Sequence, residues 1–136
     1  MDRALDNMLI YLNIEPRLIG DIIIGNVLQP GAGAYSARIG QEWAQIPMTV
    51  PIQTINRLCS SGIEAIAMVA AKIKAGQINC GIGGGMENMT MFEMKDFVPV
   101  DKLTKKAFEN ELTRDCLLTT GEVAEKCAAL FKYTRE

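Results

Sequence analysis

The chain has 136 residues, of which 49% are hydrophobic and 22% charged, a composition typical of a packed globular protein that excludes a disordered one. Its formal net charge of −2 gives no electrostatic reason to expect nucleic acid or an acidic membrane as a partner. It contains no histidine, so Ser-His-Asp, Cys-His and zinc-histidine chemistry cannot be completed within these residues.

Alternating helices and strands are predicted from the start of the chain. Residues Asp2 to Leu12 place apolar side chains at helical spacing, and Pro16 ends this predicted helix. The β-branched run Asp21 to Leu28 predicts a strand buried on both faces. A turn over residues 29–33 then leads into a second predicted helix, from Tyr35 to Gln45.

A second strand, a third helix and a third strand follow. Residues Val50 to Leu58 alternate and are β-branched, which predicts a strand. The helix predicted from Ser60 to Ala75 is apolar nearly all round, which is typical of a buried helix. Its last turn is basic and Gly76 follows it, as at a helix C-terminus. A glycine-rich third strand is predicted over Asn79 to Gly85.

The character of the chain changes at about Lys95. Residues 95–136 hold eight basic and eight acidic residues, against six and eight among residues 1–94, so we expect an exposed helical region there. We accordingly divide the chain between residues 94 and 95. The preceding order of helix and strand predicts an α/β fold with a largely parallel sheet.

Two clusters, one of glycines and one of methionines, resemble cofactor or metal sites but are better explained by packing. The glycine runs at Gly31–Ser36 and Gly81–Met86 lack the last glycine of a GxGxxG motif, so close backbone packing is favoured over nucleotide binding. The four methionines between Met86 and Met94 form no regular array and have no histidine beside them, which favours core or interface packing over a copper site. We therefore expect no metal and no tightly bound cofactor.

The cysteines form no CxxC pair, which excludes zinc-ribbon and thioredoxin-like sites and favours a reducing compartment. Cys59 differs from the others because it lies between a predicted strand and the start of the apolar helix. A thiol there would meet the unpaired N–H groups of the helix N-terminus, which favour the thiolate and could steady an oxyanion built on it. The alternative is that Cys59, like Cys80, Cys116 and Cys127, is a small buried hydrophobic residue.

The segment Asn56 to Gly62, with the sequence NRLCSSG, resembles the nucleophile motif of the thiolases. Further segments resemble that family in order and at its spacing: Gly25–Gln29, Ala37–Ile39, Ile46–Pro47, Val50–Pro51 and the GGGMENMT run Gly83–Thr90. Within the family the Gln29–Ala34 segment is most similar to the peroxisomal 3-ketoacyl-CoA thiolases, which are acetyl-CoA C-acyltransferases.

The resemblance implies a function and a fold. Cys59 would be the nucleophile that carries an S-acyl group in the thiolysis of 3-ketoacyl-CoA, a step of fatty-acid β-oxidation. Coenzyme A and acyl-CoA would be substrates, and no cofactor would stay bound. Residues 1–94 would form part of the layered α/β/α N-terminal domain. The family's first strand would be missing from its place between two of the strands present. Residues 95–136 would begin the loop domain.

The chain also departs from the family. Where the family carries MGxTAE, this sequence has Thr120 to Glu125, with Thr120 and Val123 as the differences. The family's catalytic histidine and second catalytic cysteine lie in a C-terminal half outside residues 1–136, and no other cysteine here is assigned to that role. We therefore expect negligible turnover from this chain alone. It could be a partial thiolase sequence, a split product that needs partner chains, or a remnant without catalysis.

Two further functions stay open: a non-catalytic thiolase-like protein for binding or dimerisation, and a ketoacyl-synthase type of acyltransferase. Because thiolases dimerise in part through the nucleophile strand, Val50–Leu58 is the expected contact with a second copy or with the remainder of a thiolase chain. Neither nucleic acid nor membrane is expected as a partner. The resemblance implies a peroxisomal location, with a mitochondrial one as the alternative, and we find no targeting signal in these residues.

Overall fold

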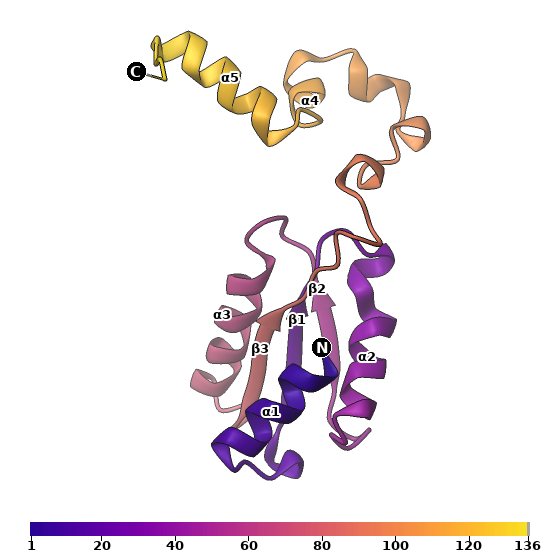
Figure 1. Cartoon of the computed structure of the whole chain (residues 1–136), viewed down its shortest axis with the longest axis vertical. Coiled ribbons are helices and arrows are strands. Elements are labelled where there is room, and N and C mark those ends of the chain that lie inside the picture. Colours follow the sequence, from indigo (N-terminus) through magenta and orange to yellow (C-terminus); the bar gives the residue numbers. More distant parts are fainter. Residues whose placement is uncertain (136) are drawn as a thin grey trace. The chain divides into compact units, whose positions relative to one another are not determined.

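The computed structural model of the chain describes residues 1–135. They form two compact units, which divide between Phe97 and Val98, and each is described by itself. In the first unit, helices and strands alternate in the predicted order (Figure 1).

A three-stranded parallel sheet forms the centre of the first unit. Strand β1 (Asp21–Gly25) lies in the middle, with β2 (Ile52–Ile55) on one side and β3 (Gly81–Gly85) on the other (Figure 1). Ile22 is paired in register with Ile52 across one edge and with Ile82 across the other. Within this chain β1 is hydrogen-bonded directly to both neighbours, and the expectation that residues 1–94 lack a first strand stays a prediction.

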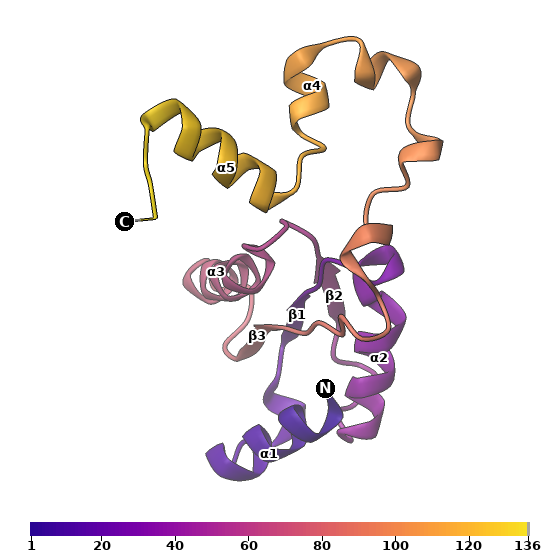
Figure 2. The ribbon, with the colours of Figure 1, turned by 45° about the horizontal axis from the view of Figure 1, so that its top comes forward.

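Helices cover both faces of this sheet. The helices α1 (Asp2–Leu12) and α2 (Ala34–Trp43) lie on one face, and α3 (Ser61–Lys74) lies on the other, which Figure 2 shows most clearly. The side chains of β1 alternate between the two faces. Ile22 and Ile24 belong to the cluster beneath α1 and α2, whereas Ile23 belongs to the cluster beneath α3. All five residues of β1 are buried, as its β-branched run predicts.

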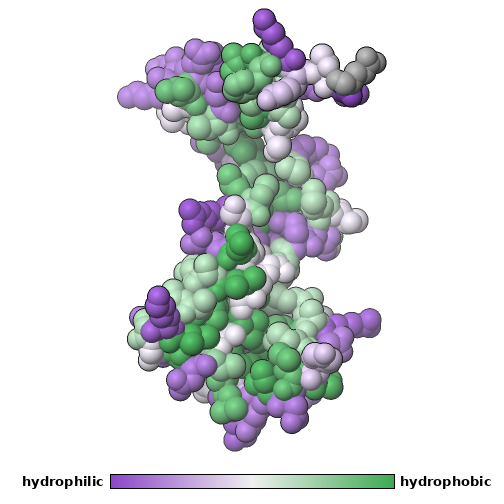
Figure 3. Space-filling view, turned by 90° about the vertical axis from the view of Figure 1, so that its left-hand side faces the viewer, coloured by the Kyte–Doolittle hydropathy of each residue, from purple (hydrophilic) through white to green (hydrophobic). Residues whose placement is uncertain are grey.

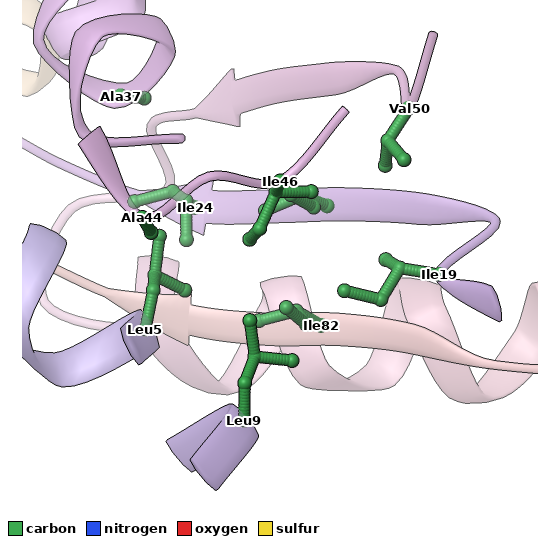
Figure 4. Close-up of a cluster of buried hydrophobic side chains, with 10 residues drawn as sticks. Leu5, Leu9, Ile19, Ile24, Ala37, Ala44, Ile46, Val50 and Ile82 are labelled. Carbon is green, nitrogen blue, oxygen red and sulfur yellow. The ribbon is translucent and has the colours of Figure 1, made fainter. Parts of the chain in front are cut away.

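The larger of the two clusters fills the space between the sheet, α1 and α2 (Figure 4). Its side chains come from α1 and α2, from β1 and β3, from the residue Ile19 ahead of β1, and from the segment between α2 and β2: they are Leu5, Leu9, Ile19, Ile22, Ile24, Ala37, Ala44, Ile46, Val50 and Ile82. Removal of this apolar surface from water is the main force that holds the two helices on the sheet.

Polar side chains of α2 fix the segment that leads into β2. Gln41 is fully buried, and its amide nitrogen donates to the carbonyl oxygens of Pro47 and Val50, each at 3.0 Å. The Arg38 guanidinium donates to Gln41 Oε1 at 2.8 Å and to the carbonyl oxygens of Met48 and Val50. These bonds set where β2 begins, and so where the residues after it emerge from the sheet.

Helix α3 lies very close to the sheet because β3 is rich in glycine. A Cβ atom added at Gly83 would stand 2.7 Å from Ile66 Cα and 3.0 Å from the Ala65 oxygen. The interpretation of the glycine runs as sites of close backbone packing is confirmed here. It is wrong for Gly31, where a Cβ atom would meet nothing within 4 Å and the backbone adopts φ +59°.

Only one side of α3 is buried. Ser61, Ala65 and Val69 face the sheet, whereas Ile63 and Ile66 are 72% and 54% exposed. Figure 3 views the molecule from the side that carries α3 and shows apolar side chains gathered there. The prediction of a helix buried on all sides is therefore wrong within this chain, although its apolar sequence was identified correctly.

The four methionines between Met86 and Met94 have different surroundings. Met86 packs against the core, whereas Met89, Met91 and Met94 are exposed.

The predicted boundaries agree with the structure to within two residues at the helices and extend too far at all three strands. Strand β3 begins at Gly81 instead of residue 79. Strand β1 ends at Gly25 instead of residue 28, and β2 covers Ile52–Ile55 instead of residues 50–58. The extra residues lie in turns whose side chains make local hydrogen bonds. Short 3-10 turns complete the chain, at Pro16–Leu18, Pro30–Gly33, Met94–Asp96, Val100–Lys102 and Lys105–Phe108.

The second unit consists of short helical segments, as predicted from its charge. Its two α-helices are α4 (Glu111–Asp115) and α5 (Thr120–Phe131). No helix within residues 1–135 is long and apolar enough to cross a membrane.

A capping box begins α5. The Thr119 N–H and hydroxyl both donate to Glu122 Oε2 at 2.8 Å, and the Glu122 N–H donates back to the Thr119 hydroxyl. These bonds from Thr119 lower the pKa of the Glu122 carboxyl below its ordinary value of 4.5, and Lys126 adds to the effect.

We expect α5 to lose helicity as the pH falls through the lowered pKa of Glu122. Because the folded helix holds the carboxylate better than the unfolded chain does, this contribution is complete above about pH 4.5 and disappears below the folded pKa. Carbon-13 NMR against pH measures the pKa of Glu122 from its carboxyl signal and the helicity of α5 from its backbone signals. In Glu122→Gln the pH dependence of α5 should flatten, and an unchanged profile in that variant would contradict the assignment.

Candidate functional site

Cys59 lies in the turn between β2 and α3, and its side chain is exposed. The parallel arrangement brings the carboxyl ends of all three strands to this edge of the sheet, which is where open α/β sheets bind their ligands. An open hollow of about 320 Å³ is found here. Its lining comes from the ends of β1 and β3 and from the turn: Gly25, Asn26, Val27, Leu58, Cys59, Ser61, Gly62, Gly85, Met86 and Glu87.

Glycine at the end of β1 lets the start of α3 approach the sheet. A Cβ atom added at Gly25 would stand 2.4 Å from the Ser61 carbonyl carbon and 2.7 Å from the Gly62 nitrogen. Any side chain at position 25 would therefore push the first turn of α3 away, and Cys59 with it. Because Gly25 and Gly85 have no side chains, the hollow is lined by backbone atoms on their side.

The first turn of α3 offers unpaired N–H groups close to Cys59. Ser60 is the N-cap and its side chain makes no capping bond. Among residues 1–135, the Gly62 and Ile63 amides have no hydrogen-bond partner in the structure. Such amides, at the positive end of a 14-residue helix, suit an anion or a developing negative charge.

The backbone just before Cys59 has an unusual conformation. Leu58 adopts φ +51°, in the left-handed region that non-glycine residues rarely enter. Its N–H donates to Asn56 Oδ1 at 3.0 Å, and its carbonyl oxygen accepts from the buried Ser61 hydroxyl at 2.6 Å. The Ser61 hydroxyl in turn accepts from the Arg57 N–H at 2.7 Å. The turn is thus fixed by side chains on both sides of Cys59.

Two functional-site residues were not assigned a role from the sequence, namely Asn26 and Glu87. One Glu87 oxygen accepts from the Val27 and Leu28 N–H groups at 3.0 and 3.2 Å, and the other accepts from Asn26 Nδ2. Asn26, only 1% exposed, also donates to the Met86 carbonyl oxygen. Glu87 therefore fixes the loop that walls the hollow. The available signal was that Asn26 directly follows the glycine that ends β1 and that Glu87 lies two residues after the glycine that ends β3.

The remaining cysteines do not join this site. Cys80 is half-buried ahead of β3, at the opposite end of the strand from the hollow, and Cys116 and Cys127 belong to the second compact unit. Thr120–Glu125, the segment compared with MGxTAE, forms the first half of α5 in that unit. In the described part of the chain no group of three His, Cys, Asp or Glu side chains could hold a metal ion.

Comparison with known proteins identifies the family. A family model described as "Thiolase, N-terminal domain" matches residues 1–136. The human peroxisomal 3-ketoacyl-CoA thiolase is 42% identical over 125 residues, which are 92% of this chain and 29% of that protein. The Yarrowia lipolytica enzyme of the same name is 43% identical, over 90% of this chain and 29% of its own length. The chain thus spans less than a third of the length of these relatives.

Solved structures agree in fold. The dimeric peroxisomal thiolase of Saccharomyces cerevisiae superimposes with a TM-score of 0.83 at 34% identity, over 98% of this chain and 36% of the yeast chain. An acetyl-CoA acetyltransferase of Bacillus anthracis superimposes with a TM-score of 0.71 at 26% identity, over 96% and 35%. The parallel sheet with Cys59 at the start of α3 and the family match over the whole sequence lead to one conclusion: the chain belongs to the thiolase family and corresponds to its N-terminal domain.

Proposed function

We propose that this chain carries the nucleophile of a thiolase-type acyltransferase, and that the nucleophile is Cys59. The observation that carries the proposal is the exposed Cys59 side chain beside the unpaired amides of α3, at the edge where the three strands end. Membership of the thiolase family supports the same reaction class. The proposed reaction is the thiolysis of 3-ketoacyl-CoA, as the names of the peroxisomal relatives suggest.

In this reaction the Cys59 sulfur bonds to the 3-keto carbon of the substrate and gives up its proton. The bond between carbons 2 and 3 then breaks, and its electron pair stays with carbon 2, which takes a proton and leaves as acetyl-CoA. An S-acyl group remains on Cys59, and the thiol of coenzyme A removes it as a shortened acyl-CoA. The helix amides would stabilise the negative charge that develops at the site. Because the chain has no histidine, we assign the proton transfers to groups outside these residues.

The other assignments follow from the same family. We propose that the second compact unit begins the loop domain, and that coenzyme A is a substrate without a bound cofactor. Strand β2 lies at an edge of the sheet, so Val50–Leu58 can pair with a second copy or with the rest of a thiolase. The yeast relative is a dimer, which supports association with a second copy. The names of the relatives support a peroxisomal location.

Acyl transfer to Cys59 tests the proposal directly. After incubation with acetyl-CoA, we expect peptide mass spectrometry to find S-acetylation at Cys59 at least roughly tenfold faster than at Cys116 or Cys127, because only Cys59 has the helix amides to stabilise the charged transition state. Cys116 and Cys127 are exposed cysteines in the same molecule and serve as internal controls.

Cys59→Ser should remove the fast acetylation and leave the slow sites unchanged. Complete thiolysis turnover by the 136-residue chain should stay negligible. Equal, slow acetylation of Cys59, Cys116 and Cys127 would instead favour the second candidate, a thiolase-like scaffold for binding or dimerisation. That candidate is supported by the exposed apolar side of α3 and the open edge of β2.

A further inference from the structure

The turn that carries Cys59 contains an unfavourable backbone conformation that side chains must maintain. Leu58 immediately precedes Cys59 and adopts φ +51°, where its Cβ atom crowds the following carbonyl oxygen. Glycine or asparagine is the usual residue there, and neither occupies the position. Strained residues of this kind persist only where the surroundings over-determine them, and they gather at functional sites.

Two side chains bind the two backbone polar groups of Leu58. The Asn56 Oδ1 atom accepts from the Leu58 N–H at 3.0 Å, and the Ser61 hydroxyl donates to the Leu58 oxygen at 2.6 Å. The Ser61 N–H also donates to that oxygen, at 3.0 Å. Leu58 itself contributes little to the packing that holds the turn, because 58% of it is exposed. The conformation therefore depends on Asn56 and Ser61 and not on burial of the leucine.

Asn56 also connects the turn to the rest of the site. Its Nδ2 atom donates to the Val27 carbonyl oxygen at 3.1 Å, while the Val27 N–H donates to Glu87 Oε2 at 3.0 Å. A continuous path of hydrogen bonds thus runs from the segment after β3, through the loop after β1, to the residue before Cys59. The sulfur of Cys59 is placed relative to the hollow by this path.

We propose that Asn56 and Ser61 are positioning residues for Cys59: by holding Leu58 in the left-handed conformation, they aim the thiol at the hollow and keep it beside the α3 amides. The inference rests on the proposed function, in which Cys59 is the nucleophile. Neither residue touches the reacting atoms. Asn56 is the better residue to test because its side chain is exposed, so substitution leaves the core intact.

The test measures the Cys59 thiol in the full chain with iodoacetamide, alongside the acetyl-CoA reaction described above. In Asn56→Ala, alkylation of Cys59 should slow by about 3- to 10-fold relative to Cys116 and Cys127, which is the effect of losing a hydrogen bond of ordinary strength. Asn56→Asp keeps the acceptor for the Leu58 N–H but loses the Nδ2 donor to the Val27 carbonyl oxygen, so it should restore only part of the rate. Ser61→Ala should also slow Cys59, but by less, because the backbone N–H of residue 61 still donates to the Leu58 oxygen.

A spectroscopic measurement separates positioning from general stability. Amide exchange at Leu58, followed by NMR, should become faster in Asn56→Ala and stay slow in Asn56→Asp. The matched control is Asn79→Ala, since Asn79 is also an exposed asparagine in the same unit. This variant should change neither the Cys59 rate nor the Leu58 exchange.

The two proposals fail in different ways. If the wild-type Cys59 is not acetylated faster than Cys116 and Cys127, the proposed function is overturned, yet a selective loss of Cys59 alkylation in Asn56→Ala still supports the positioning role. If Cys59 alkylation in Asn56→Ala equals that of the wild type or exceeds it, the positioning role is overturned, whatever the acetylation result. A lower melting temperature without a change in the Cys59 ratio also overturns it.

Discussion

Gly83→Ala is expected to lower the free energy of unfolding of the first unit by about 2–3 kcal/mol, the cost of forcing extra volume into a close-packed contact. The added methyl group would lie 2.7 Å from Ile66 Cα and 3.0 Å from the Ala65 oxygen. Both are backbone atoms of α3, so no side-chain rotation can relieve the overlap. The helix must move away from the sheet, and the Ala65 and Val69 contacts weaken as it does.

The adjacent residue supplies the control. A methyl group at Gly84 would meet nothing within 4 Å, so Gly84→Ala should change the free energy of unfolding by less than about 0.5 kcal/mol. Urea unfolding followed by the fluorescence of Trp43, the single tryptophan of the chain, reports on this unit. Equal effects of the two substitutions would contradict the close approach of α3 to β3.

Ile23→Ala is expected to have the larger effect, about 2–5 kcal/mol, which is the usual range for the truncation of a buried aliphatic side chain. Ile23 is fully buried and lies in the small cluster with Ala65 and Val69 that fastens α3 to the sheet. Few other side chains can fill the cavity, because that cluster is small. The same urea experiment with Trp43 fluorescence measures the loss.

Ile63→Ala is the matched substitution on the exposed side of α3, away from the sheet. Ile63 belongs to α3 but is 72% exposed, so its truncation should cost less than about 1 kcal/mol. A cost for Ile63→Ala as large as that for Ile23→Ala would show that the outer side of α3 is covered in solution. Such a result would contradict the exposure described for this chain.

Much of the local structure was predictable because short-range patterns determine it. The helical spacing of Asp2–Leu12 and the apolar run in residues 60–75 predicted α1 and α3 to within a residue or so. The strands were predicted too long, since their ends depend on side chains that leave the ladder to bond nearby backbone, as Asn26 and Asn56 do. Cys59 could be singled out because its position, between a strand and a helix, is a local property.

The residues that fix the site could not be found in this way. Glu87 lies about 60 positions from the Val27 and Leu28 amides that it binds, and no pattern in a single sequence links such distant groups. The left-handed conformation of Leu58 was equally hidden, because leucine is not a residue that this conformation favours. Both depend on how the ends of separate strands meet.

The amino-acid sequence by itself determined the kind of protein this is: an α/β chain of the thiolase family with one cysteine at the junction of a strand and an apolar helix. The tertiary structure alone decided that β1 pairs directly with β3, that one side of α3 stays exposed, and that Glu87 and Asn56 bond to the loop after β1 from segments distant in the sequence. The physical reason is the range of the interactions. Helix and strand propensities act over a few residues, whereas strand order, close backbone contact and hydrogen bonds between loops exist only after distant segments have packed together.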